Sequence, residues 1–318
     1  MISPLDDSLH DPGADVYWEE GARFSISIPE RLVSGWVMIH HRPNQTLSVG
    51  GLALWDPSRE NPYDCLYYDW GDLWAFDRSF TMFDCALPNG LTVAMLQPLE
   101  TFHVSYLRDE CQADLTWTAT AEPFDSSGDS GIAGGDARGG RFEQPGRLVG
   151  TISVRGDILH VDCPSSRDRA WGPGTPKPSP RSDRPWALDE DGDGFRVLAT
   201  ATSEVVYDRV DGTTEHLVSG WHRVGGVTRP LVSGTRRAVL RGDDGRPLRV
   251  EIRGTDDAGR ELAADGECVN WLRWQGYPRA LRWWCMTRWQ LRDGEAWGEV
   301  CETVPLQLSR RYARRHQR

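Results

Sequence analysis

The chain has 318 residues, which is enough for two domains of ordinary size that each bury their own core. It carries 47 acidic and 36 basic side chains, a formal net charge of −11 with neutral histidines. This excess of negative charge argues against nucleic acid or an anionic membrane surface as a general partner, because both require positive potential on the protein.

Seven cysteines are scattered along the chain without a Cys-x-x-Cys pair. An odd number of such thiols is typical of a reducing compartment, and no apolar stretch is long enough to span a bilayer. The first residues lack the basic and apolar regions of a signal peptide. We therefore expect a cytoplasmic protein without integral membrane segments, and the sequence leaves its oligomeric state open.

Short segments with a period of two dominate the first part of the chain. They cover residues 23–28, 34–40, 46–54 and 91–96, and turn residues separate them. Such alternation is typical of half-buried β-strands. A run rich in glycine, serine and aspartate follows at 125–140, and we interpret it as a linker because it has too few apolar side chains to pack.

The same alternation of apolar and polar residues resumes after this run. Residues 149–161 predict two strands joined by a tight turn at Arg155-Gly156-Asp157. Further alternating segments cover 195–201, 215–223, 248–252 and 283–289. These patterns indicate an all-β protein with few helices.

The two parts show weak internal sequence similarity, since Val33-Ser34-Gly35-Trp36 resembles Val218-Ser219-Gly220-Trp221. We expect two tandem antiparallel β-barrels or half-barrels, with residues 1–124 and 141–318 as the domains and 125–140 between them. A single large β-sandwich is the alternative.

The most unusual stretch runs from Ser165 to Gly172 and reads Ser-Ser-Arg-Asp-Arg-Ala-Trp-Gly. On an extended chain Arg167, Arg169 and Trp171 share one face, while Asp168 points to the other. Asp168 is the first candidate for a catalytic acid or base, with Arg169 and Arg167 as tuning or anion-binding partners. The alternative is an ion pair that only fixes the strand to its neighbour.

His222 is the second candidate for proton transfer. Trp221 and Arg223 flank it, and alternation places both of them on the face opposite to the imidazole. An imidazole titrates near neutral pH and can shuttle protons. The alternative is a half-buried strand histidine without a chemical role.

Fifteen tryptophans are an unusual number for a chain of this length. Trp271 and Trp284 lie in segments where arginines and indoles follow one another closely, as they do around a pocket for a planar ligand. With Trp171 and Trp221 they are candidates for substrate binding. The alternative is that these large side chains plug a small barrel.

The signature Arg167-Asp168-Arg169-Ala170-Trp171-Gly172 and the segment Glu143-Gln144-Pro145-Gly146-Arg147 resemble the tandem lipocalin-like family related to hydroxyneurosporene synthase (carotenoid 1,2-hydratase) and the AttH-like proteins. Gly35-Trp36-Val37 and Arg42-Pro43-Asn44 are similar to the pattern of the first barrel in that family. The stretch from Trp297 to Glu302 keeps only part of a motif that relatives often carry near the end.

The resemblance implies two tandem lipocalin-like (calycin-type) β-domains and a cytoplasmic enzyme that hydrates, isomerises or cyclises a non-polar unsaturated molecule, such as a terpenoid, a carotenoid-like molecule or a polyketide. A non-catalytic carrier of such a ligand is the alternative, and an interaction scaffold is a third. No dinucleotide-binding, phosphate-binding or metal-ligand motif is present in the sequence, so we expect neither a cofactor nor a metal.

Overall fold

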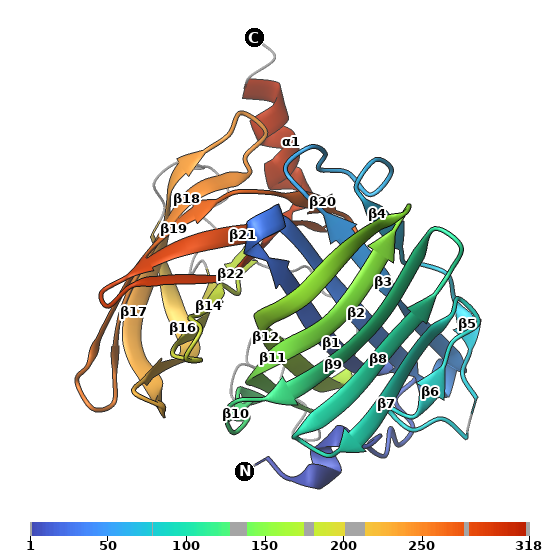
Figure 1. The fold of residues 1–318 in the computed structure, drawn as a ribbon. Helices are drawn as coiled ribbons and strands as arrows, with labels where there is room; N and C mark the ends of the chain where they lie inside the picture. Colours follow the sequence, from blue (N-terminus) through green and yellow to red (C-terminus); the bar gives the residue numbers. More distant parts are fainter. Residues whose placement is uncertain are drawn as a thin grey trace. The chain divides into compact units, whose positions relative to one another are not determined.

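The computed structural model describes residues 2–77, 79–127, 139–174, 181–200, 214–276 and 280–315, with residues 311–315 described by their backbone alone. The chain divides into two compact units. Unit 1 comprises Met1–Ile28, Ser34–Leu54 and Leu66–Thr175, and unit 2 comprises Pro29–Val33, Trp55–Cys65 and Pro176–Arg318. Nearly all regular structure is β-strand, so the prediction of an all-β protein in two parts is confirmed (Figure 1).

Unit 1 is built on one long antiparallel sheet. Its strands run in the order β4-β3-β2-β1-β12-β11-β9-β8-β7-β6, with β5 beside β3 and β10 beside β11. The strands are β1 (Trp18–Ile28), β2 (Val33–Arg42), β3 (Leu47–Trp55), β4 (Tyr67–Asp69), β5 (Trp74–Ala75), β6 (Cys85–Ala86), β7 (Leu91–Gln97), β8 (Thr101–Leu107), β9 (Cys111–Ala119), β10 (Phe124–Asp125), β11 (Gly140–Val154) and β12 (Asp157–Pro173). Two short 3-10 helices accompany them, η1 (Pro4–Asp7) and η3 (Pro43–Gln45), while η2 (Pro29–Arg31) belongs to unit 2.

The hairpin of β11 and β12 corrects the domain boundary expected from the sequence. In the sheet, β12 lies between β1 and β11, and β11 pairs with β9 (Figure 1). Residues 140–173 therefore complete the first sheet instead of opening a domain at 141. Residues 128–138 of the predicted linker lie outside the described part of the chain.

The turn of this hairpin follows the sequence prediction. Val154 pairs with Asp157, so Arg155 and Gly156 form a two-residue loop, and both have positive φ angles of 50° and 92°. Two positive φ values define the turn type that matches the twist of a β-hairpin.

Side chains bridge the two ends of the sheet in unit 1. The Tyr67 hydroxyl of β4 lies 2.6 Å from the Tyr106 hydroxyl of β8, which donates to Asp69. Asn89, in the β6–β7 turn, donates to Asp69 Oδ2 at 2.9 Å and to the carbonyl of Gly50 at 2.9 Å. These side-chain contacts join β4, at one end of the sheet, to β8 and the β6–β7 turn near the other end. Among the described strands no backbone pairing joins β4 to β6, so the sheet is curled but open.

Unit 2 contains a closed barrel. Eight strands pair in the cycle β22-β14-β15-β16-β17-β18-β19-β21, and β21 returns to β22, while β13 and β20 pair outside this cycle. The elements are β13 (Ser182–Asp183), β14 (Trp186–Leu188), β15 (Gly194–Thr200), β16 (Thr214–Val224), β17 (Val227–Arg241), β18 (Pro247–Asp256), β19 (Glu261–Cys268), β20 (Leu272–Trp274), β21 (Ala280–Leu291), β22 (Glu295–Pro305) and α1 (Leu306–Arg315).

Each unit has its own core. In unit 1 aromatic side chains pack edge to face, with the Phe83 and Phe102 ring centroids 4.8 Å apart and those of Phe102 and Trp117 5.8 Å apart. In unit 2 the aliphatic and aromatic side chains that line the barrel pack together, and Phe195 contacts Trp289 edge to face at 5.1 Å. Among the described residues, neither the length nor the hydropathy of any helix suffices for a membrane crossing.

The aromatic core of unit 1 predicts a large asymmetry within one strand. Phe102 is fully buried and Leu107 is 68 % exposed, both on β8. We expect Phe102→Ala to lower the free energy of unfolding of unit 1 by about 3–5 kcal/mol, and Leu107→Ala to change it by less than about 0.5 kcal/mol. Urea unfolding followed by tryptophan fluorescence measures both, and equal effects of the two substitutions would contradict this core.

Candidate functional site

Strand β12 presents the signature residues alternately to the two faces of the sheet in unit 1. Arg167 pairs in register with Phe24 of β1 and Gln144 of β11, so these three side chains share the face of the aromatic core. Arg169 and Trp171 lie on the same face, two and four residues further along the strand. The prediction that Asp168 points away from them is confirmed by its contacts.

The Arg167 guanidinium is fully buried in unit 1. Nη1 donates to Asp7 Oδ1 at 2.6 Å, and Nη2 donates to Gln144 Oε1 at 2.8 Å. The carbon Cζ lies 4.3 Å from the ring centroid of Phe102. Three further rings surround the guanidinium: those of Phe83, Trp117 and Phe142. Burial lowers the pKa of Arg167, and the carboxylate of Asp7 opposes this shift.

Arg169 is also fully buried, and its partner is the equally buried Glu20 of β1. Nη2 of Arg169 donates to Glu20 Oε2 and, at 2.8 Å, to the carbonyl of Ser8. Burial favours the neutral form of Glu20, but hydrogen bonding from His10 and the Arg169 charge outweigh it and lower the pKa of this carboxyl. The ring of His10 stacks on Trp171, with centroids 4.1 Å apart and planes at 8°.

Sequence reasoning did not single out Asp7, His10 or Glu20. Two arginines on an apolar strand face do require carboxylate partners, because a buried charge without a counter-charge is strongly unfavourable. The need for partners can be read from β12 alone. Their identity depends on long-range contacts that bring the first residues of the chain to this strand.

Asp168 lies on the other face of β12 and is partly buried. Arg23 Nε donates to Asp168 Oδ2 at 3.0 Å, and Arg141 Nη2 lies 3.4 Å from Oδ1. The two guanidinium groups expected to tune Asp168, those of Arg167 and Arg169, lie on the opposite face of the strand, and the groups in contact with Asp168 are those of Arg23 and Arg141. Two positive neighbours favour the carboxylate over the acid form.

His222 lies in unit 2, on the face of β16 that points into the barrel. It pairs in register with Phe195. Its side chain is 10 % exposed, and Nδ1 lies 3.6 Å from Oδ2 of Asp256. Burial and the charge of Arg260 lower the pKa of His222, against the opposing effect of Asp256. The imidazole is therefore neutral near pH 7.

Arg260 holds Asp256 beside this histidine. Arg260 Nε donates to Asp256 Oδ2 at 2.6 Å and its backbone N–H donates to Oδ1 at 2.8 Å. Burial opposes ionisation of Asp256, but these hydrogen bonds outweigh it and lower its pKa. Arg260 also donates to the carbonyls of Val224 and Val227, so it joins the β16–β17 turn to the carboxylate.

The remaining predicted tryptophans do not line the barrel beside His222. Trp221 is buried on the opposite face of β16, in register with Arg196. Trp284 also lies on the outward face, with the guanidinium carbon of Arg282 5.1 Å from its ring. Trp271 packs against one edge of the core, and its Nε1 donates to the carbonyl of Pro247 at 2.8 Å. The structure therefore places His222 and these three indoles in unit 2 but does not bring them to one site.

A layer of charged side chains, which sequence reasoning missed, crosses the interior of the barrel. This charge layer consists of Arg181, Asp183, Glu215, Arg236, Arg241 and Glu302, all with side chains at most 4 % exposed. Arg236 Nη2 lies 2.7 Å from Asp183 Oδ2, and Arg241 donates to both oxygens of Glu302 at 2.8 Å. Three carboxylates thus face three guanidinium groups.

The pKa values of two carboxyl groups in the charge layer, Asp183 and Glu302, shift in opposite directions. Burial raises the pKa of Asp183 to about 6, together with the nearby carboxylates of Glu302 and Glu215 and against the charge of Arg236. Burial also acts on Glu302, but Arg241, Arg181 and Arg236 outweigh it and hold the pKa of this carboxyl well below its usual range. Asp183 therefore changes charge at mildly acidic pH.

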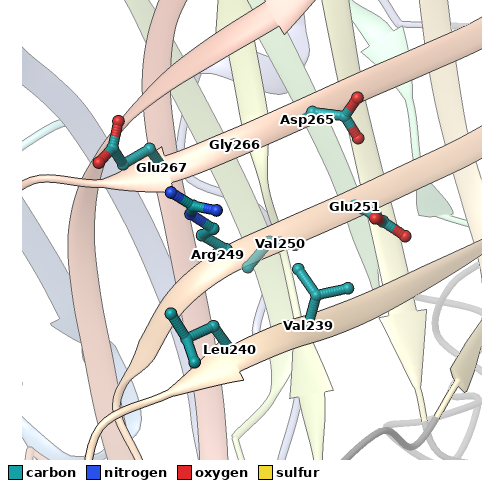
Figure 2. A pocket seen from close by; sticks show the side chains of 8 residues that line it. All are labelled: Val239, Leu240, Arg249, Val250, Glu251, Asp265, Gly266 and Glu267. Atoms are coloured by element: carbon teal, nitrogen blue, oxygen red, sulfur yellow. The ribbon is translucent and has the colours of Figure 1, made fainter.

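A shallow hollow lies on strands β17, β18 and β19 of unit 2, and Figure 2 shows the side chains around it. Its lining combines Val239 and Leu240 with Arg249 and three acidic residues, Glu251, Asp265 and Glu267. Arg237, Arg253 and Arg288 pair with these acids at 2.7–2.9 Å. The hollow is thus edged by satisfied surface ion pairs. In the described part of the chain, no group of three or more histidine, cysteine or acidic residues is placed to hold a metal ion.

An open curled sheet followed by a closed eight-stranded barrel is the architecture of tandem lipocalin-like proteins. The chain belongs to the family described as "Domain of unknown function (DUF7064)", whose model matches residues 3–304. A search of curated proteins finds no match.

Solved structures resemble the fold over almost the whole chain. A putative AttH protein from Nitrosomonas europaea shares 13 % identity with a TM-score of 0.66, covering 96 % of each chain. Kievitone hydratase from Nectria haematococca shares 13 % identity with a TM-score of 0.55, covering 96 % of this chain and 93 % of that one. CghA shares 11 % identity with a TM-score of 0.53 and covers 95 % of both chains. At these identities the likeness confirms the predicted fold.

The charge layer predicts a specific pH dependence of stability. The pKa of Asp183 rises from an ordinary 3.8 to about 6 on folding, so between these values the folded state binds more protons than the unfolded state. The contribution of Asp183 is therefore complete below about pH 4 and is lost as the pH rises through 6. We expect Asp183→Asn to remove this decline of the unfolding free energy.

Asp265→Asn is the matched control, because Asp265 is exposed and paired with Arg253 on the surface. It should leave the wild-type pH profile of urea unfolding unchanged. A decline between pH 4 and 6 that persists in Asp183→Asn would show that another group causes it.

Proposed function

We propose that this protein is an acid–base enzyme that hydrates a non-polar, unsaturated small molecule without a cofactor. The observation that carries the proposal is the pair of His222 and Asp256 inside the barrel of unit 2. A neutral imidazole beside a carboxylate is the arrangement of a general base. The resemblance to kievitone hydratase supports hydration as the reaction class.

The proposed step balances without an oxidant or reductant. His222 takes a proton from a water molecule as the water oxygen forms a bond to an electron-poor carbon of the substrate double bond. The imidazolium then gives the proton to the neighbouring carbon, and the neutral base is restored. Asp256 stabilises the imidazolium in between. Phe195, the register partner of His222, and Trp289 provide a non-polar surround for the substrate.

Asp168 has a structural role in unit 1 in this proposal and no part in the reaction. Its two guanidinium neighbours, Arg23 and Arg141, favour the carboxylate, and a proton donor needs the acid form. We therefore assign proton donation to His222 instead of Asp168. The pair of Arg23 and Asp168 links β1 to β12.

A second candidate function is binding of a non-polar ligand without turnover. The buried ion pairs of Arg167 and Arg169 favour it, because both guanidinium groups already hold the fold together. A carrier of this kind would bind the substrates of the proposed enzyme and release them unchanged.

Substitution of His222 separates the two functions. We expect the wild-type protein to add one molecule of isotopically labelled water to at least one member of a panel of terpenoids and polyketides whose double bond is conjugated to a carbonyl group, read out by mass spectrometry. His222→Gln should lower this rate about 100-fold or more, since general base catalysis contributes that much. His216 is an exposed histidine on the same strand, and the control substitution His216→Gln should leave the rate unchanged.

Equal rates in the two variants would remove His222 from the mechanism. Binding of panel members without any incorporation would favour the carrier.

A further inference from the structure

The first residues of the chain reach into the core of unit 1. The leading segment, residues 3–10, contacts β12 at three points. Asp7 pairs with Arg167, the carbonyl of Ser8 accepts from Arg169, and His10 stacks on Trp171. Leu5, in the short helix η1, is 78 % exposed. The segment is thus anchored by polar and stacking contacts of single side chains more than by an apolar face.

Arg167 offers a complete site for one carboxylate. Both of its terminal nitrogens reach Asp7, at 2.6 and 3.3 Å, and the backbone N–H of Leu99 donates to Asp7 Oδ2 at 2.7 Å. Four aromatic rings exclude water from the guanidinium. A two-pronged guanidinium and a backbone donor in a desolvated setting are what a carboxylate requires for tight binding.

Trp171 offers a second subsite on the same strand face. The His10 ring lies flat on the indole, which is the geometry that a planar π-system would also adopt. Trp171 follows Arg167 by four residues, which on an extended strand corresponds to about 13 Å. Arg169 lies between these two residues on the strand, and the carboxylate of Glu20 balances its charge. The part of the site between the two subsites therefore carries no net charge.

We propose that Asp7 and His10 occupy, within the protein's own chain, a binding site for an elongated aromatic carboxylic acid. The carboxylate of the ligand replaces that of Asp7 on Arg167, and its planar part replaces His10 on Trp171. The leading segment leaves as the ligand enters. This site lies in unit 1 and binds its ligand without a chemical reaction, so the inference is independent of the proposed hydration by His222.

Competition by the leading segment sets the affinity. The apparent dissociation constant equals the intrinsic one divided by the fraction of molecules whose site is open. Weakening the internal carboxylate raises that fraction. It therefore raises the affinity for a carboxylate ligand without changing the ligand's own contacts.

The test uses trans-stilbene-4-carboxylate and its neutral alcohol, 4-(hydroxymethyl)-trans-stilbene, as probes of the full-length protein. We expect Asp7→Asn to lower the dissociation constant of the carboxylate at least tenfold, measured by quenching of tryptophan fluorescence. The alcohol should gain less than twofold. Asp11→Asn removes the same charge from an exposed neighbour without contact to Arg167 and should change neither value.

An unchanged carboxylate affinity in folded Asp7→Asn, or an equal gain for both probes, would overturn the proposal. Should Asp7→Asn fail to fold, hydrogen exchange of the wild-type protein decides. The saturating carboxylate, but not the alcohol, should speed exchange in residues 3–10 and at the Leu99 amide. Unchanged or slower exchange at these positions overturns the displacement.

Discussion

A guanidinium group that is buried in a protein core requires a carboxylate partner, and the pair of Arg167 and Asp7 in unit 1 is the plainest case in this protein. Removal of one partner from such a pair costs about 3–5 kcal/mol, because the other charge stays buried. Arg169 with Glu20 repeats the pattern in unit 1, and the charge layer repeats it in unit 2. Both units therefore combine a non-polar wall with a fully buried ionic interior.

This constraint decides which residues can take part in chemistry. Arg167 and Arg169, the most prominent residues of the sequence signature, are occupied by the protein's own carboxylates. Asp168 is paired with two other arginines, Arg23 and Arg141. His222, by contrast, is a neutral base with an oriented carboxylate and non-polar neighbours. The signature thus organises unit 1, while His222, the base of the proposed hydration, lies in unit 2.

Much of the fold could be predicted from the sequence because its signals are local. The period of two located the strands, and the pair Arg155-Gly156 located the turn between β11 and β12. Alternation also placed Asp168 opposite Arg167 and Arg169. The domain boundary could not be predicted in the same way, because the pairing of β12 with β1 joins residues far apart in the chain.

The sites were less predictable for the same physical reason. Asp7, Glu20 and Asp256 look like ordinary surface acids in the sequence, and only long-range contacts bury them beside their partners. Trp221 and Trp284 were expected to line a pocket, but they are buried on the outward faces of their strands. Burial on both faces of a strand erases the difference between core and surface that alternation usually reveals.

The coupling between Asp7 and Arg167 measures how far a buried guanidinium depends on its carboxylate. A double-mutant cycle with Asp7→Asn, Arg167→Met and the combined variant measures the coupling through urea unfolding of unit 1. We expect a coupling free energy of about 2 kcal/mol or more, so that the combined variant is more stable than the sum of the two single effects would give. A coupling below about 0.5 kcal/mol would contradict this, because the two charges would then not depend on each other in the core of unit 1.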